Sequence, residues 1–297
     1  MDVDAIVIGG GVAGLQSALT LGRACRRVLV VDAGQTRNRF APHSHNLLTR
    51  DGTPPAELVR LGRRDLALYD VSFIAGRVTA VARVDHGFEV TLDTGATRRA
   101  GGLVFATGQR DRLPPIPGVA EAWGRSVFAC PYCHGWEFRG RPLAVLGQDD
   151  YAAHMVRLIS AWTPNVHLLT NGPWAPGAEA KVGLGHFEVH HGVLSGLDVE
   201  ASALRGVRFA DGHLLQVDGL LLRPETEPQT ALLESLGVEL TDAGLPKIDM
   251  MQASSVPGVF VAGDLGWMMA SLSFALSSGM MAGAGLNHHL VAVNGGR

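Results

Sequence analysis

The stretch that decides the fold reads Ala5-Ile6-Val7-Ile8-Gly9-Gly10-Gly11-Val12-Ala13-Gly14. Its first four residues are a short, fully apolar run of the kind found in a buried parallel strand. A helical pattern follows the glycines to about Arg23, and a second apolar run over 28–31 ends at Asp32. This order of strand, G-x-G-x-x-G, helix, strand and acid is the order that a dinucleotide-binding βαβ unit requires.

Each residue of this motif has a physical reason. Gly9 and Gly11 permit a tight turn and close approach of the backbone to a pyrophosphate, and Gly14 lets the helix and strand pack closely. The helix N-terminus offers unpaired N–H groups and the positive end of its dipole to the phosphates. Asp32 stands where a carboxylate can accept hydrogen bonds from ribose hydroxyls. We therefore predict a dinucleotide site at these four residues.

The chain repeats the βαβ pattern. A strand-like run over 142–146 leads to Gly147, a helical stretch follows over about 151–162, and residues 166–169 read as the next strand. The Pro-rich stretch 113–118 before this repeat makes a plausible linker. We therefore expect a second nucleotide-type domain to begin near residue 114.

A further strand comes near the C-terminus. Residues 258–262 read as a strand that runs into the turn Gly263-Asp264. A helix over about 271–290 follows it and is rich in Ala, Gly, Ser and Met. Small side chains on a helix predict close packing against another layer.

Composition bounds the class of protein. With 297 residues, 46% hydrophobic and 18% charged, the chain can form two domains with sizeable cores. The net charge of −3 gives no excess of positive charge that would indicate nucleic acid binding. No apolar run approaches the length of a membrane span, and the N-terminus opens with acids and is interrupted by glycines, unlike a secretory signal. With only three cysteines, we expect a cytoplasmic protein.

Two of the three cysteines stand in Cys130-Pro131-Tyr132-Cys133-His134. Cysteines at i and i+3 can close a small disulfide ring, and each thiolate is stabilised by its neighbour. A structural zinc site needs four ligands, commonly from a second such pair. His134 could add a third ligand, but Cys25 stands alone far upstream and no fourth ligand follows. We therefore predict redox chemistry and no metal site; an incidental pair is the remaining alternative.

These motifs together resemble the pyridine nucleotide–disulfide oxidoreductases, most closely the low-molecular-weight thioredoxin reductase-like flavoproteins, over nearly the whole chain. The resemblance implies an α/β fold of two Rossmann-like three-layer domains, the second inserted into a discontinuous FAD domain. The implied boundaries are 1–113 and 245–297 for the FAD domain and 114–244 for the inserted, NADPH-domain-like module with the cysteine pair. It also implies a homodimer.

The resemblance extends the candidate FAD site beyond the first motif. It includes His45-Asn46, Thr107-Gly108 after an apolar strand, and Gly263-Asp264, which in this family places a carboxylate near the flavin ribityl chain. The implied FAD-binding residues are Gly9, Gly11, Gly14, Asp32, His45, Asn46, Thr107, Gly108, Gly263 and Asp264. The Gln that commonly precedes the last helix in relatives is absent, and Ser271 stands nearest its place.

The sequence departs from the family where NADPH should bind. The second βαβ loop reads Gly147-Gln148-Asp149-Asp150-Tyr151-Ala152, so Asp149 replaces the second glycine and brings both a side chain and a negative charge toward a pyrophosphate. After the next strand the chain reads Thr170-Asn171-Gly172-Pro173, without the cations that hold a 2′-phosphate in relatives. We expect a domain that kept its fold and does not use NADPH; a variant loop with displaced phosphate contacts is the alternative.

The residue after the cysteine pair also departs from thioredoxin reductases. The Cys-x-x-Cys-His segment resembles that of the FAD-dependent dithiol oxidases, which close disulfides in natural products of the dithiolopyrrolone and epipolythiodioxopiperazine kinds. An imidazole titrates near neutrality, so His134 can exchange a proton with a thiol. The alternative is a histidine that only caps or packs. Cys25, in the first helix, is expected to be a buried thiol without chemistry.

The leading hypothesis is a dithiol oxidase with Cys130, Cys133 and His134 as catalytic residues. A small-molecule or protein dithiol would exchange with the disulfide through a mixed disulfide at Cys130. Cys133 would pass two electrons to FAD, which oxygen would reoxidise. A thioredoxin-type reductase that takes electrons from NADPH, ferredoxin or a second flavin is the first alternative. A non-catalytic redox sensor is the second.

Overall fold

The computed structural model describes residues 1–177, 183–185 and 187–294. The chain folds into two compact units. Unit 1 comprises Met1–Arg37, Pro55–Arg110 and the chain from Thr226 onward, and unit 2 comprises Asn38–Pro54 and Asp111–Glu225. Both are α/β, and the parallel sheets at their centres confirm the predicted fold class.

Unit 1 is built on a seven-stranded sheet in the order β3-β2-β1-β6-β5-β4, with β17 paired to β6. Strands β1, β2, β3, β6 and β17 are parallel, whereas β4 and β5 are antiparallel to their neighbours. The strands are β1 Val3–Ile8, β2 Val28–Asp32, β3 Val71–Ala75, β4 Val78–Val84, β5 Gly87–Leu92, β6 Thr97–Phe105 and β17 Val259–Val261. The helices are α1 Val12–Arg23, α2 Pro55–Leu66, α7 Ala231–Ser235 and α8 Leu272–Asn294, with short 3₁₀ turns η1 Arg37–Phe40 and η3 Gly263–Gly266.

The two faces of this sheet bury separate cores, which gives unit 1 its three layers. Alternate residues of β1 point to opposite faces: Ala5 and Val7 pack with α1 and α8, while Ile6 and Ile8 pack with β4, β5 and the region of α7. All four are at least 96% buried, because a central parallel strand is covered on both sides. The apolar run that predicted this strand is therefore explained by its position.

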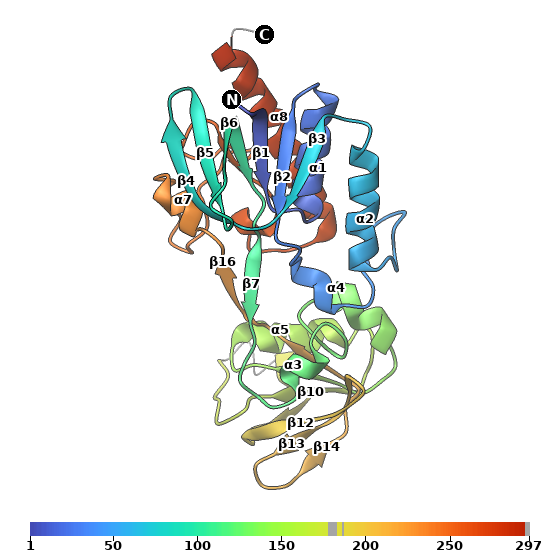
Figure 1. The fold of residues 1–297 in the computed structure, drawn as a ribbon. Coiled ribbons are helices and arrows are strands. Elements are labelled where there is room, and N and C mark those ends of the chain that lie inside the picture. The colour runs from blue at the N-terminus through green and yellow to red at the C-terminus, as the bar shows by residue number, and fades with distance from the viewer. Residues whose placement is uncertain (178–182, 186, 295–297) are drawn as a thin grey trace. The chain divides into compact units, whose positions relative to one another are not determined.

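Helix α8 lies alongside α1, and small residues make the contact close (Figure 1). A Cβ atom on Gly283 would lie 2.8 Å from the carbonyl oxygen of Ser17, and one on Gly279 would collide with the Ala13 carbonyl. The Ser17 hydroxyl donates a hydrogen bond to the Gly279 carbonyl at 2.9 Å. The prediction of close packing from the small residues of this helix is thus confirmed.

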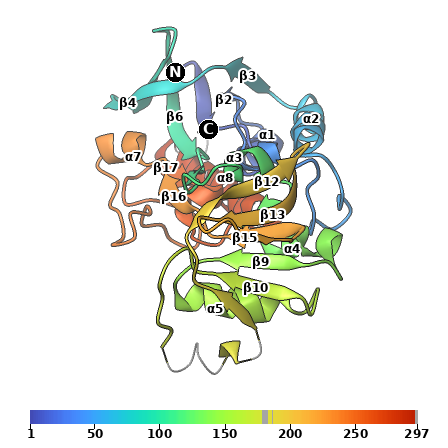
Figure 2. The same cartoon turned by 90° about the horizontal axis from the view of Figure 1, so that it is seen from below.

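Unit 2 is built on a five-stranded parallel sheet in the order β11-β10-β9-β15-β8. Helix α5 covers one face and the antiparallel sheet β12-β13-β14 covers the other (Figure 2). The strands are β8 Val127–Phe128, β9 Leu143–Leu146, β10 Val166–Leu169, β11 Glu188–His190, β12 Leu194–Glu200, β13 Ala203–Phe209, β14 Leu214–Leu215 and β15 Gly219–Leu222. The helices are α3 Val119–Ala122, α4 Pro131–His134 and α5 Asp150–Ile159, with the 3₁₀ turn η2 Gly135–Phe138.

Strands β7 (Gln109–Arg112) and β16 (Glu225–Pro228) carry the chain between the two units and pair with each other. The unit boundaries therefore differ from the predicted ones at 113/114 and 244/245. Residues 226–244 belong to unit 1 because Leu233 and Val238 complete its core against β4. Residues 38–54 belong to unit 2, so the first domain is interrupted twice.

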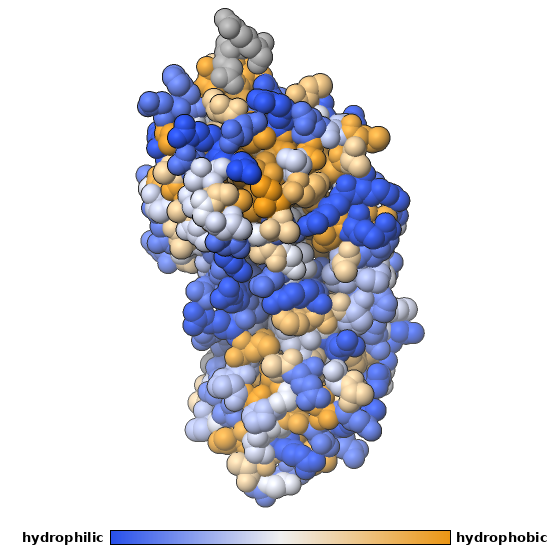
Figure 3. Space-filling model, in the orientation of Figure 1, coloured by the Kyte–Doolittle hydropathy of each residue, from blue (hydrophilic) through white to orange (hydrophobic). Residues whose placement is uncertain are grey.

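Hydrophobic residues form separate patches among hydrophilic ones on the face drawn in Figure 3. Over the described residues, no helix has both the length and the apolar character needed to span a bilayer.

Candidate functional site

The glycine motif of unit 1 lies between the end of β1 and the start of α1. Gly9 has φ +109°, and a Cβ there would collide with the Ala106 carbonyl at the end of β6. A Cβ on Gly14 would collide with the Gly9 carbonyl, so this glycine lets the helix approach the strand. Gly11 differs, because nothing lies within 4 Å of an ideal Cβ there. The backbone beside Gly11 therefore borders open space.

The N-terminus of α1 is free of side-chain caps and of acids. Gly11 is the N-cap, it makes no side-chain hydrogen bond, and the first turn contains no acidic residue. The first N–H groups of a helix have no intrahelical partner, and the dipole makes this end positive. An anionic diphosphate bound in the open space beside Gly11 would accept hydrogen bonds from these N–H groups and neutralise the positive end of the dipole.

Asp32 ends β2 and is 8% exposed. Its Oδ2 accepts a 2.7 Å hydrogen bond from the Arg63 guanidinium of α2, and its Oδ1 accepts one from the Gly34 N–H at 3.0 Å. A cavity of about 370 Å³ opens here, lined by residues that include Asp32, Arg63, Arg77 and Asp93. The carboxylate is thus fixed at the edge of a space that can take a nucleoside.

Gly263 and Asp264 follow β17 and begin η3. Gly263 has φ +74°, and its N–H donates a 2.9 Å hydrogen bond to the Ser278 hydroxyl of α8. The Asp264 carboxylate accepts a 3.0 Å hydrogen bond from Arg37. This ion pair neutralises a largely buried carboxylate and joins the segment after β2 to the start of η3.

Thr107 and Gly108 are tied to the return of the chain into unit 1. The Thr107 hydroxyl donates to the Gln229 carbonyl at 3.2 Å, and the Gln229 N–H donates to the Gly108 carbonyl at 3.2 Å. The next residue, Gln109, is buried and donates through Nε2 to the Asp264 carbonyl at 2.6 Å. Thr107 and Gly108 therefore connect the end of β6 to β16, while Gln109 anchors η3.

The residues of unit 1 fit a dinucleotide such as FAD. The open space at Gly11, the uncapped N-terminus of α1 and the fixed Asp32 carboxylate supply the phosphate and ribose contacts that such a cofactor needs. The other residues predicted to bind FAD that lie in this unit are Gly9, Gly14, Thr107, Gly108, Gly263 and Asp264.

Unit 2 contains the cysteine pair. Cys130 and Cys133 form a disulfide with a Cα–Cα distance of 5.3 Å at the start of the short helix α4. Pro131 takes the first helical position, where its missing N–H leaves no unsatisfied bond. Both cysteines are half-buried, whereas Tyr132 and Trp136 beside them are 59% and 63% exposed. The pair therefore lies in a segment with large apolar side chains open to solvent.

His134 packs inside unit 2, next to Cys133 in the chain. Its ring stacks on Phe128 with the centroids 5.2 Å apart, and both ring nitrogens are shielded from solvent without a well-formed hydrogen bond. Burial lowers the pKa of His134 below the ordinary value of 6.5, although the Gly124 carbonyl and the Glu137 carboxylate raise it in part. Burial therefore favours the neutral imidazole over the charged one.

His45 and Asn46 lie in unit 2 and not with the glycine motif. His45 Nε2 is 3.6 Å from a carboxylate oxygen of Glu137, and its Nδ1 is 3.5 Å from Asp51. His45, Glu137 and His134 line one cavity of about 300 Å³. Asn46 is exposed, and its N–H donates to Asp51. The structure thus brings His45 near the cysteine segment, while its predicted contact with FAD stays a prediction.

The second βαβ loop differs from the first where it meets its helix. Asp149 is the N-cap of α5, and its carboxylate accepts a 2.8 Å hydrogen bond from the Ala152 N–H. Asp150 adds a second acid in the first turn. The end of α5 that would hold a pyrophosphate is therefore occupied by this protein's own carboxylate.

The polar side chains of the segment after β10 also make hydrogen bonds within unit 2. The buried Thr170 hydroxyl donates to the Gly172 carbonyl at 2.5 Å, and the Asn171 side-chain carbonyl accepts from the Leu194 N–H at 2.8 Å. Thr170 therefore bonds within its own loop, and Asn171 holds that loop to β12.

The sequence did not single out four of the residues that shape these sites. Arg37 and Arg63 are distant in the chain from the carboxylates they pair with, and Gln109 and Glu137 belong to no motif. A buried or ordered acid needs a partner. That rule calls for a cation near Asp32 and Asp264 but does not say which arginine supplies it.

Cys25 corrects another expectation. It is exposed and has φ +60°. Helix α1 ends at Arg23, and the N–H groups of Cys25 and Arg26 bond back to the carbonyls of Gly22 and Leu21. This is the Schellman pattern, in which the residue at the Cys25 position is left-handed and lies beyond the helix. The thiol therefore leaves the sheet instead of packing on it.

A dinucleotide site in one unit and a cysteine disulfide in the other define an oxidoreductase that couples a bound dinucleotide to a pair of thiols. The chain belongs to the pyridine nucleotide-disulphide oxidoreductase family, whose model matches residues 3–282. It is a thioredoxin reductase-like FAD-dependent disulfide oxidoreductase, and membership implies a flavin cofactor.

Three similar proteins illustrate the relationship. Thioredoxin reductase tcpT of Claviceps purpurea is 33% identical over 98% of this chain and 95% of its own length. The crystal structure of HlmI has a TM-score of 0.93 and 36% identity, covering 98% of this chain and 93% of that one. An oxidoreductase from Agrobacterium tumefaciens has a TM-score of 0.90 and 34% identity over 98% and 99% of the two chains.

Proposed function

We propose that this protein is a dithiol oxidase that passes electrons from a substrate dithiol through Cys130 and Cys133 to FAD and then to O2. One observation carries the proposal: the Asp149 carboxylate caps α5 at the position where a reductase would bind the pyrophosphate of NADPH. The uncapped N-terminus of α1 supports a bound FAD in the same chain. A donor other than NADPH must then reduce the flavin, and the cysteine pair is the route for it.

The protein's own residues carry out the thiol exchange. A substrate thiolate attacks Sγ of Cys130, which forms a mixed disulfide and releases Cys133 as a thiolate. The second substrate thiol then attacks the substrate sulfur of the mixed disulfide, so the substrate leaves as a disulfide and Cys130 is also reduced. FAD held by unit 1 would supply the acceptor for the electron pair of the reduced cysteines, and O2 would be the final acceptor, reduced with two protons to hydrogen peroxide.

His134 supplies the base for this exchange. The thiolate is the nucleophile, so each substrate thiol must lose its proton before it attacks. His134 follows Cys133 directly in α4, and burial favours its neutral ring, which is the form that accepts a proton. His45 and Glu137 line the same cavity as His134 and give the proton a polar path onward. We assign them to positioning and proton transfer.

The surroundings of the disulfide favour a substrate with an apolar body. Tyr132 lies edge-on to Trp162 at 5.6 Å, and the Arg139 guanidinium stacks on Trp136 at 4.1 Å. Both Tyr132 and Trp136 nevertheless keep most of their surface exposed. Exposed aromatic rings beside a redox pair offer stacking surface to a small cyclic or aromatic dithiol. We also propose that the enzyme acts as a homodimer, which light scattering of the purified protein tests.

Anaerobic titration of the FAD-loaded protein tests the direction of electron flow. We expect dithiothreitol to bleach the flavin and NADPH to leave it yellow over the same time. Admitting oxygen should restore the colour and yield one hydrogen peroxide per disulfide formed. Rapid bleaching by NADPH would instead support a thioredoxin-type reductase, the function that the name of the Claviceps purpurea relative favours.

Two variants decide whether the cysteine pair carries the electrons. Cys133→Ser should abolish oxygen consumption with dithiothreitol. Cys25→Ser is the matched control, because Cys25 is an exposed thiol outside the disulfide. Full turnover in Cys133→Ser would contradict the proposed route and favour a redox sensor.

A further inference from the structure

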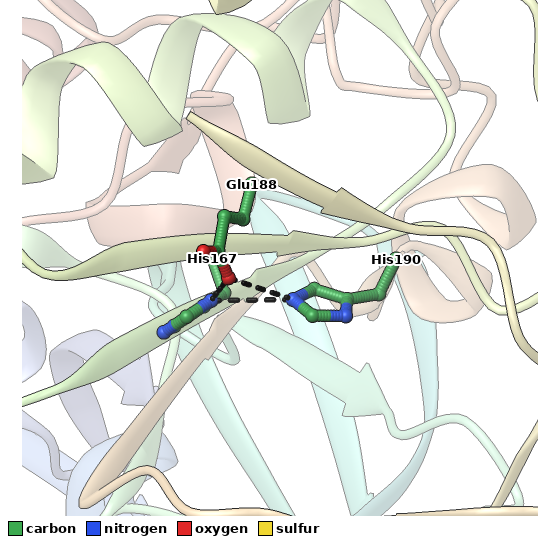
Figure 4. A group of neighbouring side chains, drawn as sticks. All are labelled: His167, Glu188 and His190. Carbon is green, nitrogen blue, oxygen red and sulfur yellow. Dashed lines mark hydrogen bonds and ion pairs between the residues drawn. The ribbon is translucent and has the colours of Figure 1, made fainter. Parts of the chain in front are cut away.

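Three donor side chains converge at the edge of the parallel sheet of unit 2 (Figure 4). His167 lies on β10, and Glu188 and His190 lie on the edge strand β11. The parallel register pairs His167 with Glu188 and Leu169 with His190. Because side chains alternate along a strand, all three donors project from the same face. Residues more than twenty positions apart in sequence thus meet through strand pairing.

The donor atoms are as close together as ligands of one metal ion. His167 Nδ1 lies 3.2 Å from Glu188 Oε2 and 3.2 Å from His190 Nε2, and the last two atoms are 3.7 Å apart. Zinc–nitrogen bonds of about 2.0–2.1 Å in a tetrahedron separate neighbouring ligands by roughly 3.3–3.4 Å. An octahedral ion at about the same bond length would bring adjacent ligands to roughly 2.9 Å. The observed triangle is closer to the tetrahedral one.

Hydrogen bonding explains the three short distances among these donor atoms less well than a shared metal ion does. A single N–H of His167 can point at Glu188 or at His190 but not squarely at both, while the three donor lone pairs can all point at one cation. His167 and His190 are 12% and 22% exposed, whereas Glu188 is 74% exposed. Two largely buried imidazoles therefore form the base of the site, and a carboxylate closes it on the solvent side.

We propose that His167, Glu188 and His190 bind one divalent transition-metal ion of the zinc class, with water as the fourth ligand on the exposed side. Two imidazoles and one carboxylate are a donor set that zinc takes in proteins, with the fourth position open. The ion would clip the edge strand β11 to β10 and so stabilise unit 2. This site is distinct from the Cys130–Cys133 disulfide and needs no electron transfer.

The nearby histidines give a matched control. The Phe209 ring packs against both His213 and His190, with centroid distances of 5.5 Å and 5.9 Å, and His213 is not part of the convergent group. His191 Nδ1 lies 3.1 Å from the Thr170 hydroxyl. Among the residues that the structure describes, no other group of three His, Cys, Asp or Glu side chains converges in this way.

Calorimetric titration of zinc chloride into the FAD-loaded, oxidised and metal-stripped full chain tests the proposal. The Cys25→Ser background removes the exposed thiol as a competing ligand. We expect one zinc ion per chain and a rise in the thermal unfolding midpoint. His167→Ala and His190→Ala should each weaken binding by about 100-fold, and Glu188→Gln by about 10-fold. His213→Ala should bind as the background does.

The same titration can overturn the proposal. Failure of the background protein to bind zinc stoichiometrically at micromolar free metal would exclude the site. Unchanged zinc affinity in both Glu188→Gln and His190→Ala would place any bound ion elsewhere. Glu188 is exposed, so its variant keeps the test valid even if the buried histidine variants fail to fold. Oxidase turnover is not a readout, so this result is independent of the proposed function.

Discussion

Helices α1 and α5 begin in the same structural context, after a buried parallel strand and a glycine turn, yet their N-termini are opposite in chemistry. Gly11, the N-cap of α1, borders open space, and α1 has no side-chain cap and no acid in its first turn. Helix α5 starts at Asp149, whose carboxylate already accepts an N–H bond, and Asp150 follows. One N-terminus is open to an anion, and the other is closed by the chain itself.

The difference shows that two βαβ units of one chain can differ in how the N-termini of their helices are satisfied. Unit 2 keeps the buried strands β9 and β10 and the apolar face of α5, because these form its core. A core residue is retained for packing, whereas phosphate contacts are retained only for binding. A change of electron donor would therefore be expected to alter the residues of the loop before α5. Exchanging Gly11 of α1 and Asp149 of α5 tests this interpretation.

The largest effect is expected when α1 is given the acid of α5. A carboxylate about 4 Å from a phosphate charge costs about 4 kcal/mol at an effective dielectric constant of about 20. Gly11→Asp should therefore weaken FAD binding by about 10³-fold. Gly11 has φ −70° and nothing near its Cβ position, so the apoprotein should still fold. Flavin absorbance after gel filtration and circular dichroism measure the two outcomes.

Ala56→Asp is the control for this experiment. Ala56 is exposed in the first turn of α2, so the new acid adds the same charge at the N-terminus of a different helix. It should retain FAD. Full retention of FAD in Gly11→Asp as well would mean that the open space beside Gly11 does not hold the pyrophosphate.

The next effect tests the proposed role of His134 in unit 2. Removing a positioned general base lowers turnover by about 10²-fold or more. His134→Asn should therefore retain FAD and the disulfide and lose about 10²-fold in dithiol oxidation. His43→Asn, which changes an exposed histidine lining the same cavity, is the control. An equal loss in both variants would exclude a specific role for His134.

The free energy of unfolding and the activity should both fall as the pH is lowered through the pKa of His134. Burial lowers the pKa of His134 in the folded protein below 6.5, its ordinary value. As the pH falls from 6.5 through the folded pKa, the unfolded chain binds the proton more readily, so the free energy of unfolding decreases. Activity falls in the same window because the base becomes protonated. A flatter acid limb in His134→Asn, in both pH–rate and urea unfolding curves, is the expected result.

Much of the fold could be predicted because local pattern and tertiary position agree. The run Ala5-Ile6-Val7-Ile8 is apolar at every position, and β1 is buried on both faces. The glycine turn, the second strand and the close packing of α8 could also be predicted from the sequence. Asp149 was also identified in the sequence as the residue that replaces a motif glycine, and its carboxylate caps α5. That it excludes NADPH stays a prediction.

The remaining features depend on contacts between distant segments. Nothing near Asp32 in sequence indicates Arg63, and nothing near His45 indicates Glu137. The proposed metal ligands His167 and His190 become neighbours only through the parallel register of β10 and β11. Residues 226–244 were assigned to the wrong unit because the return of the chain through β16 has no sequence signal of its own.

The reverse exchange, which gives α5 the glycine of α1, should change cofactor affinity by a smaller factor. Asp149→Gly removes the carboxylate from the N-terminus of α5, while glycine remains an acceptable N-cap that costs only a few tenths of a kcal/mol. We expect NADPH to bind about 5-fold more tightly than to the wild type, since charge removed near a helix N-terminus is worth about 1 kcal/mol. Asp150→Asn, which removes one charge but keeps the cap, should gain less. Equal NADPH affinity in all three proteins would show that Asp149 does not exclude the cofactor.

The smallest effect concerns what Asp149 does for the fold itself. Its carboxylate satisfies the Ala152 N–H, and replacing such a cap by alanine costs about 1 kcal/mol of the free energy of unfolding. Asp149→Ala should therefore lower the urea midpoint of unit 2, whereas Asp149→Gly and Asp150→Ala should lower it less. Oxidase turnover with dithiothreitol should stay unchanged in all three variants, because the cysteine pair lies outside α5. Greater destabilisation by Asp150→Ala than by Asp149→Ala would contradict the capping role, and the carboxylate of Asp149 would then need another reason to stand where a glycine stands in α1.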